Sequence, residues 1–159
     1  MAAATHPKRA SLPLPGGREG AGVVVTPMRT GEILAMPRFF QRPSGPLSTL
    51  RGLGLLTPKS RWTWVPAPCF LVEHPEAGPF LVDTGLHPAA RDNVRRAYGR
   101  RAALAYKMRL EEGSTVGARL LDRGLDPLGL GLVVMTHLHY DHTGSVEAFP
   151  RAPFVCDQR

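Results

Sequence analysis

A cluster of metal-binding residue types constrains this chain more than any other feature of its sequence. The sequence HLHYDH at residues 137–142 holds three of the six histidines in the chain, together with one aspartate. Neutral imidazole is the commonest metal ligand in proteins, and zinc sites are built from His nitrogen and from Asp or Glu oxygen. The spacing H-x-H-x-D-H therefore predicts a metal site made of His137, His139, Asp141 and His142.

The residues before the cluster predict how it is presented. Residues 132–136, LVVMT, form an apolar and β-branched run after a glycine, which is typical of a buried parallel strand. Side chains alternate along a strand, so two further extended residues would point His137 and His139 in the same direction. Asp141 and His142 follow in a tighter turn and can face a second metal.

A structural role for these histidines is the alternative interpretation. A single histidine near the end of a strand is usually a structural or surface residue. Burying several ring nitrogens without partners would cost roughly 1–3 kcal/mol each. Three histidines and an aspartate at this spacing are hard to reconcile with that cost, so we favour the metal site.

The motif is similar to the metal-binding signature of the metallo-β-lactamase superfamily, and two upstream segments extend the resemblance. Residues 79–88, PFLVDTGLHP, look like the superfamily's second signature, an apolar strand that closes in Asp-Thr-Gly. Residues 68–75, PCFLVEHP, look like the partner strand of a hairpin. The phrase HLHYDHTG and the segment APFVC at 152–156 look closest to N-acyl homoserine lactonases. The resemblance runs from about residue 62 to the C-terminus.

The resemblance implies an α/β fold, the metallo-β-lactamase-like αββα sandwich. In that superfamily the first metal takes a third histidine from further along the chain, another aspartate bridges the two metals, and a last histidine completes the second. No histidine follows His142 in this sequence. We therefore expect residues 23–159 to form a partial domain, about the N-terminal half of the sandwich. Residues 1–22, rich in Ala, Pro and Gly, are expected to be a disordered tail.

Resemblance to the lactonases implies a zinc-dependent hydrolase that opens the lactone ring of N-acyl homoserine lactones (quorum quenching) through a metal-bound hydroxide. Two zinc ions are expected in the complete site, and cobalt, manganese or iron could replace them. His137 and His139 would bind the first metal, and Asp141 and His142 the second. Asp141 would also act catalytically, handing a proton to the leaving oxygen. Asp83 would lie behind the ligands and orient one of them.

Two alternatives to the lactonase remain open at this point. The first keeps the superfamily and changes the substrate, giving a thiolester hydrolase of the glyoxalase II kind or a phosphoester hydrolase. The second is a catalytically incompetent truncated fragment. Four ligands divided between two metals leave each metal with two, whereas zinc takes four.

The net charge of +7 is concentrated in one segment, residues 91–109. Its basic residues are Arg91, Arg95, Arg96, Arg100, Arg101, Lys107 and Arg109, against Asp92 alone. Such a segment can bind nucleic acid, but few aromatic residues are interleaved, and the apolar positions recur at helical spacing. A solvated helix face is therefore favoured, and the expected partner is a small ester or lactone.

Localisation and redox state follow from what the sequence lacks. No apolar run is long enough to span a membrane, and Pro13 and Pro15 interrupt the leucines near the N-terminus, so no signal peptide is recognisable. We expect a cytoplasmic protein whose Cys69 and Cys156 are reduced and buried in strands. The sequence makes no prediction about oligomeric state.

The order of elements is expected to be a block of strands followed by alternating strand and helix. Ser114 is expected to cap the second helix. Strands are expected at 23–26, 33–36, 62–65, in a hairpin at 68–83, at 132–136 and at 153–156, helices at 88–101, 114–124 and 143–149, and a long loop at 37–60.

Overall fold

The computed structural model describes residues 22–36, 45–48, 50 and 58–157. Their strands form one six-stranded mixed sheet, with the strand order β4-β1-β2-β3-β5-β6. The strands are β1 (Val24–Ala35), β2 (Thr63–His74), β3 (Gly78–Val82), β4 (Met108–Arg109), β5 (Val133–Met135) and β6 (Phe154–Cys156). The α-helices are α2 (Val94–Ala105), α3 (Val116–Leu121) and α4 (Tyr140–Thr143), and 3-10 turns lie at Lys59–Arg61, Pro88–Arg91, Pro127–Gly129 and Val146–Ala148.

The sheet joins an antiparallel half to a parallel half. β1, β2 and β3 pair antiparallel in chain order, whereas β5 lies parallel to β3 and β6 lies parallel to β5. This confirms the parallel strand expected at 132–136 and the hairpin expected at 68–83. The mixed sheet with its helices is the α/β arrangement that the sequence predicted.

Two of the expected strand divisions are wrong. The runs at 23–26 and 33–36 belong to the single strand β1, whose pairing with β2 is irregular between Arg29 and Glu32. The break in the apolar pattern that suggested two strands is this irregularity. The segment at 62–65 is likewise the start of β2, which continues through two prolines to His74.

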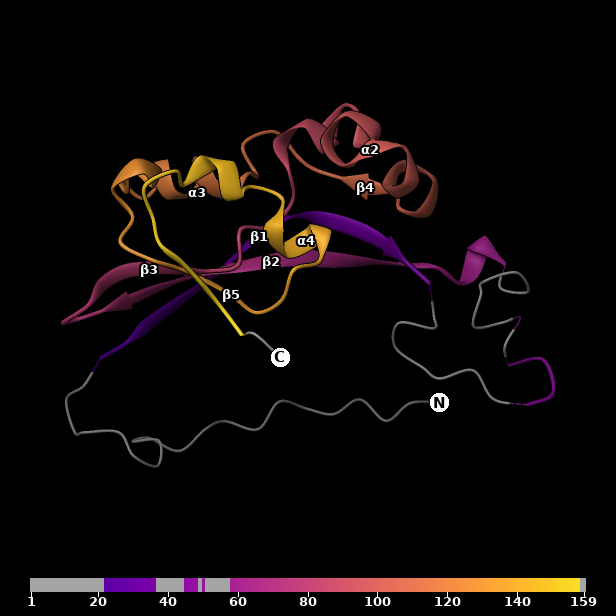
Figure 1. Ribbon diagram of the computed structural model, residues 1–159, viewed down its shortest axis with the longest axis horizontal. Coiled ribbons are helices and arrows are strands. Elements are labelled where there is room, and N and C mark those ends of the chain that lie inside the picture. Colours follow the sequence, from indigo (N-terminus) through magenta and orange to yellow (C-terminus); the bar gives the residue numbers. More distant parts are fainter. Residues whose placement is uncertain (1–21, 37–44, 49, 51–57, 158–159) are drawn as a thin grey trace.

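The helices α2, α3 and α4 all lie on one side of the sheet (Figure 1). α3 turns Val116 and Leu120 inward, and both are fully buried. They pack in one cluster with sheet residues that alternate along their strands, as expected for a strand with one covered face. The buried members of this cluster are Met28, Cys69, Leu71, Leu81, Val116, Leu120, Leu130, Val133, Met135 and Phe149.

The boundaries of the helices differ from those expected. The helix expected at 88–101 is a 3-10 turn followed by α2, which Asn93 caps and which kinks at Gly99, where φ is 83°. The cap of α3 is Thr115 and not Ser114. Ser114 is buried, and its hydroxyl donates to the carbonyls of Thr30 and Glu111. A short polar side chain that bonds to the backbone explains both positions, so the pattern alone could not separate them.

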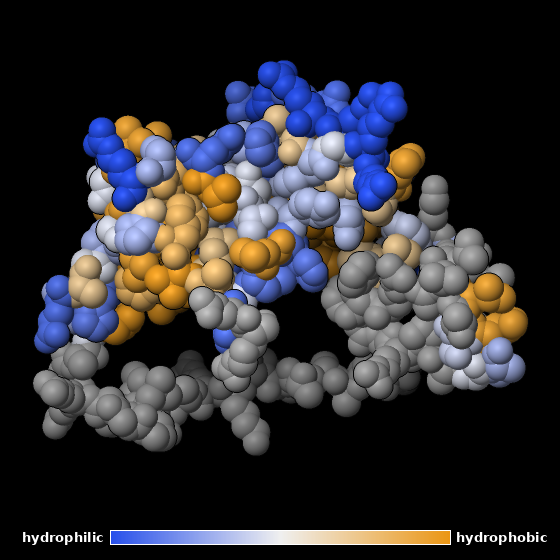
Figure 2. Space-filling model, in the orientation of Figure 1, coloured by the Kyte–Doolittle hydropathy of each residue, from blue (hydrophilic) through white to orange (hydrophobic). Residues whose placement is uncertain are grey.

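α2 presents the basic segment to solvent. Arg95, Arg96 and Arg100 are exposed, whereas Val94 and Tyr98 are half-buried at helical spacing. Figure 2 shows strongly hydrophilic residues gathered at the top of the view, where α2 lies. The expectation of a solvated helix face therefore agrees with the exposure of these arginines.

Cys156 is exposed in β6, which corrects the prediction that both cysteines are buried. Residues 1–21 of the expected tail and most of the loop expected at 37–60 lie outside the described residues. Among the helices that the structure describes, none is both long and apolar enough to cross a membrane.

Candidate metal centre

The predicted metal ligands lie beyond the C-terminal ends of the neighbouring strands β3 and β5. Because these two strands are parallel neighbours, the segments that follow them meet at the same edge. β3 is followed by residues 83–87, which we call the Asp-Thr-Gly loop. β5 is followed by residues 136–144, which contain the histidine cluster and which we call the motif loop. Residues about fifty positions apart in sequence are thereby brought into contact.

Asp83 connects the two loops through a buried carboxylate. Its side chain is only 2% exposed, and its backbone has a φ of 64°, a left-handed conformation that Asp adopts more readily than most residues. One oxygen accepts from the Thr136 backbone N–H at 2.9 Å. The other accepts from the Thr136 hydroxyl at 2.8 Å and lies 2.7 Å from Nδ1 of His142. The carboxylate therefore holds the start and the end of the histidine cluster together.

The contact with Asp83 selects the tautomer of His142. An ionised carboxylate can only accept, so Nδ1 of His142 carries the hydrogen and Nε2 keeps its lone pair. Nε2 points to the side of Asp141, whose Oδ2 lies 3.4 Å away. A carboxylate that fixes the orientation of an imidazole in this way is the arrangement that supports histidine ligands in metal sites.

The ring of His137 contacts those of the other two histidines of the cluster. The ring centroids of His137 and His139 are 4.6 Å apart, and those of His137 and His142 are 3.9 Å apart. Loss of hydration lowers the pKa of His137 below its ordinary value, and His142 and His139 lower it further, against the opposite effect of Asp141 and Asp83. The lowered pKa favours the neutral form of His137, which is the form that binds metal.

The residue types of this cluster suit zinc, but too few of their side chains converge on one point to hold an ion. Imidazole nitrogens and a carboxylate oxygen lie side by side, with one tautomer already fixed for coordination. Among the residues that the structure describes, no three His, Cys, Asp or Glu side chains are placed to hold one ion together. Four-coordinate zinc would need ligands beyond those that the described residues bring together. The assignment of His137, His139, Asp141 and His142 as ligands stays a prediction.

A ladder of hydrogen bonds fastens the Asp-Thr-Gly loop to the motif loop. The backbone N–H and the hydroxyl of Thr84 both donate to the carbonyl of His142, at 2.7 and 2.8 Å. The N–H of Gly144 donates to the carbonyl of Gly85 at 2.8 Å. Each glycine is required by close approach, because an added Cβ would lie 2.2 Å from Thr30 Oγ1 at Gly85 and 2.3 Å from the His87 nitrogen at Gly144.

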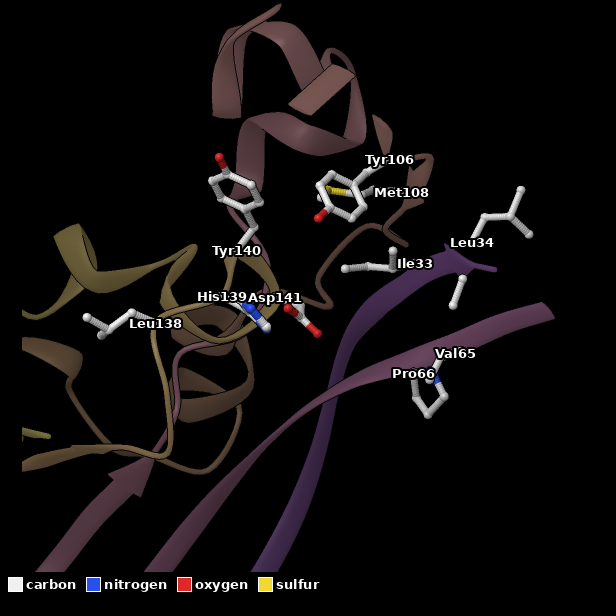
Figure 3. A pocket seen from close by; sticks show the side chains of 11 residues that line it. Ile33, Leu34, Val65, Pro66, Tyr106, Met108, Leu138, His139, Tyr140 and Asp141 are labelled. Carbon is white, nitrogen blue, oxygen red and sulfur yellow. The ribbon is translucent and has the colours of Figure 1, made fainter. Parts of the chain in front are cut away.

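A largely apolar pocket opens beside the histidine cluster. It has a volume of about 490 Å³. In Figure 3 the imidazole of His139 and the carboxylate of Asp141 project from the motif loop toward the strands that carry Ile33 and Pro66. The pocket is lined by Ile33, Leu34, Ala35, Val65, Pro66, Tyr106, Met108, Leu138, His139, Tyr140 and Asp141. It places apolar walls directly next to two of the predicted ligands.

Comparison with protein families identifies this arrangement. Residues 62–157 match the model of the Metallo-beta-lactamase superfamily. The chain belongs to the metallo-β-lactamase superfamily. The matched range starts one residue before β2 and includes both loops of the candidate site, which are the segments that carried the resemblance in the sequence. The resemblance expected from the sequence is therefore confirmed.

The most similar proteins of this superfamily include several N-acyl homoserine lactonases. The chain is 33% identical to the lactonase AttM of Azorhizobium caulinodans over 60% of this chain and 35% of that protein. It is also 33% identical to a lactonase of Bacillus cereus, over 57% of this chain and 36% of that protein. The chain thus spans about a third of the length of these curated relatives.

A solved structure gives the same result for the fold. It is an N-acyl homoserine lactone hydrolase with the product N-hexanoyl-L-homoserine bound at its catalytic metal center. The TM-score is 0.62 at 25% identity, and the match covers 82% of this chain and 46% of that one. The described sheet and helices therefore correspond to part of the metallo-β-lactamase fold.

Sequence reasoning missed two residues that organise the site. Thr136 contacts Asp83 through both its backbone and its hydroxyl, and its hydroxyl also lies 3.1 Å from Nδ1 of His137. The position of Thr136 directly before the motif could have indicated this role. Tyr98 lies on α2, and burial raises the pKa of its phenol to about 12. Nothing in the local sequence linked Tyr98 to the site, because the link depends on how α2 packs.

Proposed function

We propose that this protein is a metal-dependent hydrolase that opens the lactone ring of N-acyl homoserine lactones. The observation that carries the proposal is the apolar pocket whose far wall contains His139 and Asp141. An N-acyl homoserine lactone has the same division into an apolar acyl chain and a polar ring. The names of the similar lactonases support the same substrate class.

The pocket walls suggest how the substrate would lie. The acyl chain would contact Ile33, Val65 and Met108, which come from β1, β2 and β4. The lactone carbonyl would then face His139 and Asp141. Apolar surface removed from water contributes roughly 25 cal/mol per Å², so binding should strengthen with the length of the acyl chain.

The residues of the motif loop would hold the metals and move one proton. His137 and His139 would bind one ion, and Asp141 and His142 the second. When bound, zinc would polarise the ester carbonyl and lower the pKa of a coordinated water from 15.7 toward about 7. Asp83 would keep Nε2 of His142 free for coordination by holding the hydrogen on Nδ1.

Asp141 would complete the ring opening. Attack by water on the lactone carbon breaks the bond to the ring oxygen, which needs a proton to leave as an alcohol. The carboxylate of Asp141 borders the pocket; it would take a proton from the attacking water and pass it to the departing ring oxygen. The product carries a free carboxylate and a free hydroxyl. Zinc is the expected metal, and cobalt, manganese or iron are the alternatives. The cytoplasmic location expected from the sequence belongs to the same proposal.

The proposal is tested by following ring opening of medium-chain acyl homoserine lactones in a pH-stat, with zinc or cobalt added to metal-free protein. The control is the His74→Ala variant, which removes an imidazole at the β2–β3 turn, where Nδ1 accepts from the backbone of Glu76 and Ala77. We expect metal-dependent turnover in the wild type and in this control, and none in His139→Ala. A thiolester or phosphotriester turned over far faster than any lactone would reassign the substrate. Absence of metal-dependent turnover on the whole panel would favour the alternative of a catalytically incompetent fragment, and the same result with a full-length version would refute a hydrolase.

A further inference from the structure

Tyr98 lies where α2 meets both loops of the candidate site. Its phenol oxygen accepts a hydrogen bond from the backbone N–H of His87 at 2.6 Å, at the end of the Asp-Thr-Gly loop. The same hydroxyl donates to the backbone carbonyl of Tyr140 at 3.1 Å, in the motif loop. One side chain from a helix therefore binds the backbone of both loops at once.

The carbonyl that Tyr98 binds has lost its helical partner. In a continuing helix, the carbonyl of Tyr140 would accept from the N–H of Gly144, four residues later. That N–H donates to Gly85 in the neighbouring loop instead. Because α4 is only four residues long, its carbonyls depend on donors from outside the helix. The Tyr98 hydroxyl supplies that donor at Tyr140.

The position of this carbonyl matters because Tyr140 stands between two predicted ligands, His139 and Asp141. A displacement of the Tyr140 peptide would shift both neighbours. The end of the motif loop also packs closely on Tyr98, since a Cβ at Gly144 would lie 2.4 Å from the Tyr98 oxygen. The ring of Tyr98 also packs against that of Tyr140, with centroids 5.2 Å apart.

We propose that Tyr98 is a positioning residue, which sets the backbone of the motif loop so that His139 and Asp141 face the metals. The proposal rests on the proposed function, because it assigns Tyr98 a role toward the same metal site. Tyr98 contacts neither substrate nor metal in this role. It acts through the peptide of Tyr140.

The chain offers a matched control in Tyr106. Its ring also packs on that of Tyr140, with centroids 5.8 Å apart. Among the described residues, its hydroxyl makes no hydrogen bond. Tyr98→Phe and Tyr106→Phe therefore remove the same atom from the same aromatic cluster, but only the first removes hydrogen bonds to the loops.

Two measurements on the wild type and on both variants test the proposal. The first is the amide spectrum and hydrogen exchange of the metal-free chain, read at His87 and at residues 140–142. The second is zinc affinity, measured by competition with a chromophoric chelator. Groups that support metal ligands typically change affinity by 10–100-fold, and Tyr98 acts through the backbone, so we expect about a tenfold loss in Tyr98→Phe. Tyr106→Phe should keep the wild-type affinity.

Each outcome separates the two proposals. Faster exchange at His87, shifted resonances at 140–142 and weaker zinc binding, all confined to Tyr98→Phe, support the positioning role. Shifted resonances with unchanged zinc affinity would overturn it and leave Tyr98 as a packing residue. Equal losses in both variants would overturn it as well. If the wild type bound no zinc, the proposed metal site and this inference would both fail, whereas zinc binding unaffected by Tyr98→Phe would remove the inference alone.

Discussion

Replacing Asp83 with asparagine tests how the site is organised from behind its ligands. The Asp83 oxygen that lies 2.7 Å from His142 Nδ1 also accepts from the Thr136 hydroxyl, and the second oxygen accepts from the Thr136 N–H. Asparagine keeps one acceptor and replaces the other oxygen with an NH₂ group. If the remaining oxygen stays on the Thr136 N–H, the NH₂ group faces Nδ1 of His142. That nitrogen must then accept, which moves the imidazole hydrogen to Nε2.

The size of the effect follows from these contacts. A hydrogen on Nε2 occupies the position needed for coordination, and loss of such a supporting carboxylate typically weakens metal binding by 10–100-fold. A hydrogen bond to a charged group contributes about 1.5–3 kcal/mol, so losing one such bond at Asp83 should lower the free energy of unfolding by about 2 kcal/mol. Asp83→Asn should therefore reduce both zinc affinity and stability.

The assay is zinc competition with a chromophoric chelator, combined with thermal unfolding of the metal-free chain. Thr136→Val is the comparison variant, because it removes the hydroxyl that contacts Asp83 and His137 and leaves the carboxylate beside His142. It should lose stability with a smaller loss of zinc affinity than Asp83→Asn. Unchanged zinc affinity in Asp83→Asn would show that the Asp83 contact does not orient His142 for metal, and the reasoning would be refuted.

Two further predictions concern the core around the site. Gly85→Ala should destabilise the fold by about 1–3 kcal/mol, because its Cβ would lie 2.2 Å from Thr30 Oγ1 at a positive φ. Gly113 has a similar φ but open space around it, so Gly113→Ala should lower the stability to thermal unfolding by less. Equal losses of stability in the two variants would contradict the clash at Gly85. Burial raises the pKa of Cys69 from 9.0 to about 12, so in the folded chain a thiol reagent should label Cys156 quickly and Cys69 only on unfolding. Rapid labelling of both thiols at neutral pH would contradict this labelling pattern. Between pH 9.0 and 12 only the unfolded Cys69 thiol ionises, so the contribution of Cys69 to stability should fall as the pH rises through that range.

The parts of the fold that were predicted correctly depend on local patterns. The strand before the histidine cluster, the final strand and the place of Asp83 beside the motif loop could be predicted because apolar runs and the Asp-Thr-Gly segment are contiguous in sequence. The predictions that Ser114 caps a helix and that Cys156 is buried are wrong, each for its own reason. Ser114 satisfies its hydroxyl on the backbone of β1 and does not cap α3. Cys156 lies in an apolar run on a strand that remains exposed.

The supporting contacts could not be predicted, because they depend on tertiary packing. Thr30 binds the Asp-Thr-Gly loop from β1, accepting from the Leu86 N–H and donating to the Ala67 carbonyl. Tyr98 binds two loops from α2, whose start at Val94 and kink at Gly99 differ from the helix expected at 88–101. In each case the residue type is ordinary for its element, and only the pairing of distant segments gives it a role.

The zinc content of single-histidine variants tests the central claim most directly. His137→Ala, His139→Ala and His142→Ala are each loaded with zinc, dialysed, and measured by plasma emission beside the wild type and His74→Ala. If the cluster is a ligand set, each of the three variants retains less zinc than the wild type, because one coordination position passes to water, and His74→Ala retains the wild-type amount. Full zinc occupancy in all three variants would mean that the histidines of the motif loop do not bind metal, and the account of this site would be wrong.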